Sequence, residues 1–239
     1  MKINEIGSIS SYDWGQEDVD REAKTIKKNT SSRSAPGKPK PKGDFGKHKL
    51  VPVTGLPEGF YLTYEKKTEG MGYVKHEKFI VALIDARQSM ENPNIVSYMW
   101  FTPETLYFGA PNYSSITGLK VKLLGTTSEY KGHGYAIQVY KMLVNHGQIL
   151  FSDTSQTPDG TKLWAKLTTS NEFSAWGLEV DAASSTSDLQ KTLGPIDTSN
   201  FDIVKKMVFS GYYNQFVLIP KNDTQTIELL KTKRPTWWK

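Results

Sequence analysis

The segment between residues 116 and 145 constrains the fold of this chain more than any other part. It begins with an apolar run at 116–125, passes through a polar turn that contains several glycines, and ends at Tyr135–Asn145, where apolar residues recur at helical spacing. A strand that enters a helix through such a turn gathers unpaired backbone N–H groups at the positive end of the helix. The segment therefore predicts a strand, a turn and a helix with an anion site at the helix start.

The segments on either side define the fold class. Apolar and aromatic runs predict strands at residues 60–64, 78–86, 95–101, 105–108, 148–152, 176–180 and 213–220. Helical spacing and turn residues predict helices at 158–167 and 201–209, and a polar loop or insertion at 182–197. We expect 95–101 to pair with 78–86 as a hairpin and to end at Pro103. The pattern predicts an α/β (α+β) domain with a mixed, mostly antiparallel central sheet and flanking helices.

The N-terminal part of the chain has a different composition. Residues 1–50 carry eleven Lys and Arg against seven Asp and Glu, whereas the remaining 189 residues carry nineteen against eighteen. Residues 30–43 hold three prolines and almost no apolar side chain, which predicts a linker. Residues 16–29 favour a short helix whose order of acidic and basic residues complements the helix dipole. Because this helix has little apolar face, it needs a packing partner to be stable. We expect a flexible basic tail and linker at 1–47 and one domain with a C-terminal extension at 48–239.

Several functional classes are excluded or disfavoured by what the sequence lacks. The 239 residues contain no cysteine, so disulfides, cysteine-bound zinc and a thiol nucleophile are absent. His48, His76 and His146 are scattered without the spacing of metal ligands, and we expect no metal site. No segment suits a signal peptide or a membrane span, which predicts a soluble, cytoplasmic protein with no membrane partner.

The turn itself is specific enough to compare with known anion-binding motifs. Residues 124–136 read LGTTSEYKGHGYA, which lacks the Gly-Lys-Ser/Thr of a P-loop and the third glycine of a dinucleotide-binding motif. The segment resembles the pyrophosphate loop of the GNAT N-acyltransferase superfamily, whose signature is Arg or Gln, two residues, Gly, one residue, then Gly or Ala. Lys131, Gly134 and Ala136 fill those three places, with Lys as a departure from Arg or Gln.

The resemblance implies an acyl-CoA N-acyltransferase-like fold that uses acetyl-CoA as acyl donor. By this resemblance, the strand end at Leu124, Gly125 and Thr126 would pair with the pantetheine arm. The pyrophosphate would be held at Lys131, Gly132, His133, Gly134, Tyr135 and Ala136, mainly through backbone amides. The strand at 148–152 would diverge from its neighbour and admit the thioester.

Candidate catalytic groups are less well defined. Acyl transfer to an amine needs a base, and Asp153 and Glu104, both close to strand ends, are the candidate carboxylates. As turn, cap or surface residues, both also have ordinary structural explanations. The resemblance places Trp164 where many members have an acidic tyrosine, and indole cannot supply a proton near neutral pH.

Three functions follow as hypotheses. The first is an N-acetyltransferase acting on a small-molecule or peptide amine, with the acceptor left open. The second is a catalytically inactive GNAT-fold binding or structural protein, which is suggested by Trp164, by the basic tail and by the adjacent Trp237 and Trp238. It is also considered as a phage protein, because a run at 152–164 resembles GNAT-like proteins of tailed bacteriophages. Such a protein would act in the host cytoplasm or the virion. The third is a nucleic-acid binder that uses the tail, which is also a candidate protein-docking segment; the nearly neutral body argues against nucleic acid.

Overall fold

The computed structural model describes most of the chain outside the two termini and several connecting segments. The described residues are 16–31, 44–45, 48–71, 74–90, 92–108, 114–153, 158–181, 188–196 and 214–232. The predicted linker at 30–43, the predicted helix at 201–209 and the terminal tryptophan pair therefore lie wholly or mostly outside them. No helix among these residues has the length and apolar character that crossing a bilayer requires.

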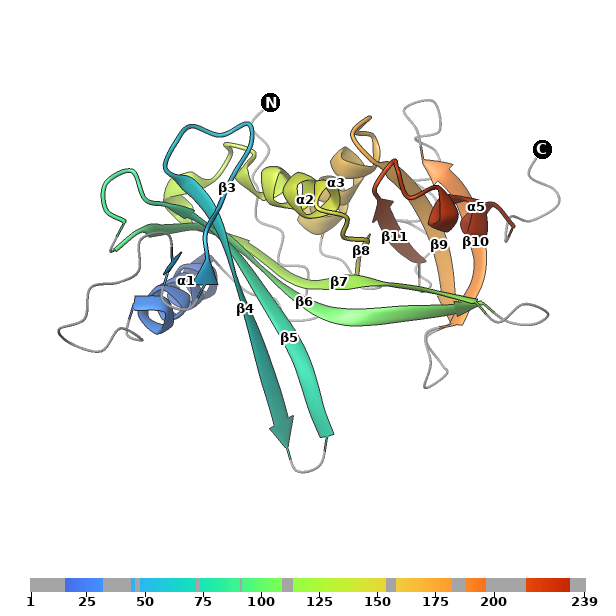
Figure 1. The fold of residues 1–239 in the computed structure, drawn as a ribbon, viewed down its shortest axis with the longest axis horizontal. Helices are drawn as coiled ribbons and strands as arrows, with labels where there is room; N and C mark the ends of the chain where they lie inside the picture. The colour runs from blue at the N-terminus through green and yellow to red at the C-terminus, as the bar shows by residue number, and fades with distance from the viewer. Residues whose placement is uncertain are drawn as a thin grey trace.

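A nine-stranded sheet forms the centre of the molecule (Figure 1). Its strand order is β10-β9-β11-β8-β7-β6-β5-β4-β3, and only the β7–β8 and β6–β10 pairings are parallel. The strands are β3 (Val51–Pro52), β4 (Phe60–Met71), β5 (Val74–Asp85), β6 (Asn94–Phe108), β7 (Ser114–Thr126), β8 (Leu150–Phe151), β9 (Ser174–Asp181), β10 (Asp188–Ile196) and β11 (Asn214–Ile219), with a separate pair of β1 (Asp44–Phe45) and β2 (His48–Lys49). The helices are α1 (Gln16–Ser31), η1 (Ser128–Tyr130), α2 (Tyr135–Asn145), α3 (Pro158–Thr168) and α5 (Thr224–Thr232). The predicted mixed, mostly antiparallel sheet with flanking helices is confirmed.

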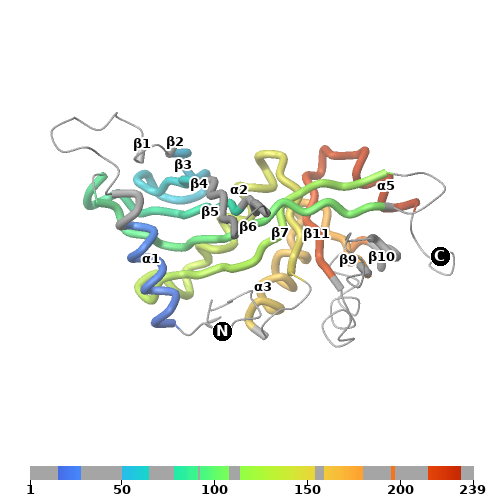
Figure 2. Tube along the Cα trace, turned by 90° about the horizontal axis from the view of Figure 1, so that it is seen from below, coloured from blue at the N-terminus to red at the C-terminus, as the bar shows by residue number. Residues whose placement is uncertain are grey.

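Strands β4 to β7 form an antiparallel meander and run side by side in Figure 2. The predicted hairpin of β5 and β6 is confirmed, with Phe79 opposite Phe101 and Ile84 opposite Ile95. The strands are longer than predicted, because β4 continues through the mostly polar residues 65–71 and β5 through residues 74–77, which form a two-stranded arm. Inter-strand backbone hydrogen bonds sustain such an arm even where no apolar alternation marks it.

Two sequence-based expectations were wrong. Pro103 does not end a strand: β6 runs through it, and Pro103 lies opposite Leu119 of β7. Proline is tolerated here because β5 pairs with β6 only as far as Phe101, so that β6 has no β5 partner at this point. The expected loop at 182–197 instead contains β10, which is antiparallel to β9, so pairing with a neighbour outweighed its polar composition.

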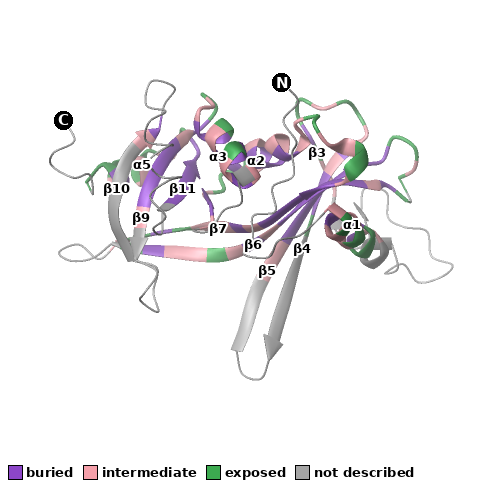
Figure 3. Cartoon of the chain, turned by 180° about the vertical axis from the view of Figure 1, so that it is seen from behind, coloured by how far each residue is buried: buried purple, intermediate pink, exposed green. Residues whose placement is uncertain are grey.

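The two faces of the sheet are packed differently (Figure 3). On the α2 face, one continuous core joins the sheet to α2 and α3, with Val121, Leu124 and Trp164 among its members. The opposite face, which we call the α1 face, carries two separate apolar clusters. One lies under α1 and includes Leu123, and the other lies beside α5 and includes Phe151.

The sheet is the packing partner that helix α1 was expected to need. Val19, Ala23 and Ile26 are fully buried against β6 and β7, one turn apart along the helix. The Tyr98 hydroxyl donates a hydrogen bond of 3.3 Å to the carbonyl oxygen of Val19. The division of the chain at residue 47 stays a prediction, but this helix within the predicted tail packs on the sheet.

Candidate active site

The turn between β7 and α2 has the geometry of an anion site. Gly132 and Gly134 adopt φ values of 79° and 77°, and Gly134 is the N-cap of α2 without a side-chain cap. The first helical hydrogen bond runs from the Gln138 N–H to the Gly134 carbonyl. In the part of the chain that the structure describes, the amides of residues 132–137 have no hydrogen-bond acceptor. They remain available at the positive end of the helix.

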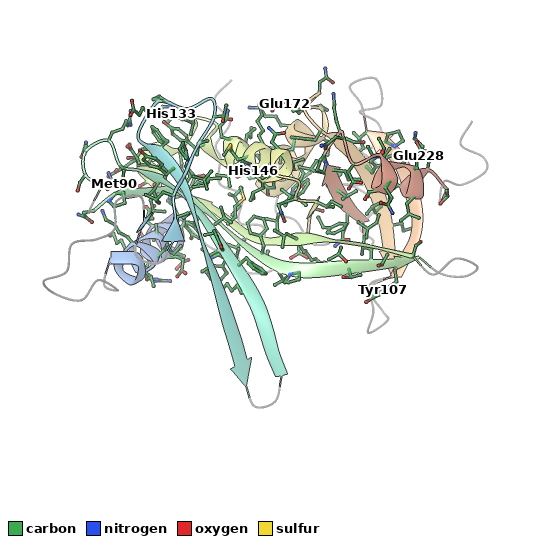
Figure 4. All side chains as sticks on the ribbon, viewed as in Figure 1. Met90, Tyr107, His133, His146, Glu172 and Glu228 are labelled. Carbon is green, nitrogen blue, oxygen red and sulfur yellow. The ribbon has the colours of Figure 1, made fainter. Side chains whose placement is uncertain are left out.

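The side chains of the turn are engaged elsewhere. Tyr135 stacks on Phe60 with ring centroids 5.4 Å apart, and Ala136 is buried in the core. The exposed His133 ring is tilted against Tyr135 and lies at the start of α2, whereas His146 lies at its other end (Figure 4). What residues 132–136 present to a ligand is therefore mainly their backbone.

Lys131 is the one cationic side chain of the turn. Its partial burial lowers the pKa of its ammonium group, while Asp20 of α1 and Asp159 of α3 raise it. Lys131 thus lies within electrostatic range of both helices. A cation in this place complements the amides in attracting an anion.

One edge of β7 is open beyond its short contact with β8. The two parallel strands pair only at Leu119 with Leu150 and at Lys120 with Phe151. A Cβ at Gly118 would lie 2.5 Å from the Ile149 carbonyl oxygen, so a side chain there would force β8 away. Beyond this contact, residues 121–126 have β6 on one side and no described strand on the other.

The predicted pantetheine residues lie on this open edge, but their side chains have structural roles. Gly125 has no room for a side chain, because a Cβ there would lie 2.7 Å from the Tyr98 ring. The Thr126 hydroxyl donates to Ser97, whose hydroxyl donates to the Gly125 carbonyl. Leu124 is buried in the core of the α2 face. A ligand along this edge would therefore meet backbone groups, of which the Gly125 and Thr126 carbonyls already accept hydrogen bonds from Ser97 and Gln16.

The two candidate carboxylates meet in one group of ion pairs, which we call the ion-pair cluster: Glu104, Lys120, Lys122 and Asp153. Lys120 Nζ lies 3.0 Å from Glu104 and 3.9 Å from Asp153, and Lys122 Nζ lies 3.2 Å from Asp153. The side chains are 8% exposed for Glu104, 13% for Lys120, 14% for Asp153 and 40% for Lys122. The cluster lies where β7 and β8 separate, on the face opposite α2. Sequence analysis missed both lysines, whose only signal was their alternation with apolar residues along β7.

Trp164 is a core residue. It is fully buried, stacks on Phe216 with centroids 5.9 Å apart and meets the Tyr140 ring edge to face. Burial also raises the pKa of Tyr140, which keeps its hydroxyl protonated. Among the described residues, neither the indole N–H nor this hydroxyl has a hydrogen-bond partner. The structure therefore gives Trp164 a packing role in the core.

The Asp85 carboxylate holds η1, the short helix just before the turn, through hydrogen bonds. The Arg87 guanidinium donates to both oxygens of Asp85 at 2.9 and 2.7 Å, and the Tyr130 hydroxyl donates to the same carboxylate at 3.0 Å. The Arg87 side-chain hydrogen bonds, opposed by burial, hold the pKa of Asp85 below its usual value. Asp85 therefore links the end of β5 to η1, which directly precedes the anion site.

Stability should depend on pH through Asp85. A lowered folded-state pKa gives stabilisation that is complete above the ordinary carboxyl pKa of about 4 and is lost as the pH falls through the lower folded value. We expect Asp85→Asn to lower the unfolding free energy by about 2 kcal/mol at neutral pH and by clearly less near pH 3. Urea unfolding at both pH values measures this. Asp159→Asn, which removes a more exposed ion pair with Lys162, is the control. An equal cost of Asp85→Asn at both pH values would contradict the assignment.

No model of a known protein family matches the chain, and no curated protein matches its sequence. The solved structures that show some similarity to the chain include three toxin-related structures. A tyrosine-to-phenylalanine mutant of the AtaT toxin has a TM-score of 0.31 and 11% identity over 38% of this chain, which spans 58% of the toxin.

The other two structures are about as similar to this chain as the first. An AtaT mutant bound to the C-terminus of the antitoxin AtaR and acetyl-CoA has a TM-score of 0.33 and 12% identity, covering 66% of this chain and 73% of that one. A tyrosine-to-phenylalanine mutant of KacT has a TM-score of 0.30 and 12% identity, covering 53% and 74%. Because these scores are low, we argue function from the geometry of the chain itself.

Proposed function

We propose that this protein is an N-acetyltransferase that moves the acetyl group of acetyl-CoA to an amine. The observation that carries the proposal is the row of unpaired amides at residues 132–137, placed at the end of an open strand edge. A diphosphate needs such donors, and an amide-bearing pantetheine arm needs an unpaired edge to pair with. The ion-pair cluster lies farther along the same edge, where the thioester would end.

The residues divide the work as follows. The amides of 132–136 and Lys131 bind the diphosphate, and the backbone of 124–126 orients the arm. Asp153 is the better base, since it contacts the more exposed lysine, whereas Glu104 is more deeply buried and contacts Lys120. Asp153 accepts a proton from the incoming amine as that amine attacks the thioester. The leaving thiolate takes its proton from water, because Trp164 has none to give.

Calorimetry with acetyl-CoA tests the proposal directly. We expect one binding site, with competition by CoA and none by adenosine, which lacks the diphosphate. Titration to millimolar acetyl-CoA without any heat of binding would end the proposal.

A second function is favoured by Trp164. A buried indole at the place of the acid suits a GNAT-like protein that binds the cofactor, or a partner, without catalysis, including the phage-encoded protein considered from the sequence. Binding of acetyl-CoA without acetylation across a panel of amines would favour this second function. The panel should contain an aminoglycoside, a polyamine, a peptide N-terminus and a lysine peptide.

A further inference from the structure

The Lys122–Asp153 ion pair spans the opening between β7 and β8. The last residues paired across these strands are Lys120 and Phe151, and Lys122 and Asp153 lie two residues further along each chain. Although the strands have separated there, Lys122 Nζ lies 3.3 and 3.2 Å from the two carboxylate oxygens of Asp153. An amine and a carboxylate therefore meet across the gap that a thioester would enter.

Lys122 is also within reach of a cofactor bound at the turn. Lys122 lies four positions before Thr126, the last residue of β7, and four steps at the rise of a strand correspond to about 13 Å. That distance suits an extended pantetheine arm running back along the open edge from a diphosphate. Lys120 is less suited as an acceptor, since its side chain is only 13% exposed and is shared between Glu104 and Asp153.

We propose, on the basis of the proposed function, that Lys122 is a self-acetylation site. Asp153 takes one proton from the Lys122 ammonium group. The freed Nζ bonds to the acetyl carbon and loses a second proton, while the carbon–sulfur bond breaks. The sulfur leaves as a thiolate, which takes up one of the two protons, and the other passes to solvent. The products are acetyl-lysine and free CoA.

Acetylation at Lys122 changes the charge beside the base. The amide that forms carries no charge and no longer pairs with the carboxylate. Asp153 then keeps Lys120, at 3.9 Å, as its remaining described cationic neighbour. The modification thus removes one of the two described ammonium groups beside Asp153.

The test compares two lysines in the chain of 239 residues. Lys231 is a matched control: it is ion-paired with Glu228 and 48% exposed, but lies on α5, remote from the turn. After incubation with isotope-labelled acetyl-CoA, peptide mass spectrometry should show Lys122 acetylated about 100-fold faster than Lys231. Lys122→Arg should abolish this product, and excess CoA should slow it in the wild-type protein.

Two failures are distinguishable when the same samples are examined by calorimetry. If acetyl-CoA does not bind, both the proposed function and the self-acetylation are overturned. If it binds, and Lys122 is modified no faster than Lys231 or equally fast after thermal unfolding, only the self-acetylation is overturned.

Discussion

Replacing Gly132 with aspartate is expected to weaken acetyl-CoA binding about 100-fold, because a carboxylate would then stand where the helix terminus should attract a diphosphate. A Cβ at this position would meet no atom within 4 Å, so the substitution adds charge without a clash. The backbone φ of 79° is one that aspartate tolerates better than most residues. Isothermal titration calorimetry of both proteins measures the effect.

Gly147 offers a matched control at the other end of α2. Its φ is 84°, and a Cβ there also meets nothing within 4 Å. Gly147→Asp therefore introduces the same charge and a similar backbone strain away from the proposed site. Equal losses of affinity in the two variants would show that strain or net charge, not a diphosphate site, is responsible.

Removing the proposed base is expected to have the largest effect on turnover. Asp153→Asn should lower kcat about 100- to 1,000-fold, which lies within the usual contribution of general acid–base catalysis, while leaving the affinity for acetyl-CoA nearly intact. Glu104→Gln should cost less, about tenfold, because Glu104 acts only by holding Lys120. Steady-state kinetics with the best acceptor, together with calorimetry, separate the two carboxylates.

The pH profile of the same variants adds an independent readout. If Asp153 is the base, the acidic limb of the wild-type kcat/KM profile should disappear in Asp153→Asn and persist in Glu104→Gln. The opposite pattern would transfer the role to Glu104. If the pH profile and the rate are unchanged in both variants, neither carboxylate takes part in proton transfer.

The elements around the turn were predictable because their signals are local. Helix α2 begins and ends where the apolar spacing of residues 135–145 predicted, and α3 agrees to within one residue. The turn, with its glycines, lies in a contiguous stretch of sequence. By contrast, β10 is polar and depends on its pairing with β9, which no short window of sequence contains.

The ion-pair cluster was only partly predictable. Asp153 and Glu104 could be proposed from their places near strand ends, but their contact through Lys120 depends on the register of β6, β7 and β8. That register joins residues 16 and 31 positions apart in the chain. The resemblance drew attention to Trp164 only as the residue at the place of an acid, and its complete burial follows from its contacts with Phe216 and Tyr140.

Helix α1 has a practical consequence for any shortened version of the protein. Its Asp20 carboxylate accepts a hydrogen bond from the Ser128 amide at 3.0 Å, and Gln16 donates to the Thr126 carbonyl at 3.3 Å. Trimming the chain to begin at residue 48 would remove both hydrogen bonds, which hold the residues just before the anion site. It would also expose the apolar cluster around Tyr98 and Leu123 to solvent. A truncated preparation would then risk aggregation, and its failure to bind a cofactor would not bear on the behaviour of the intact molecule.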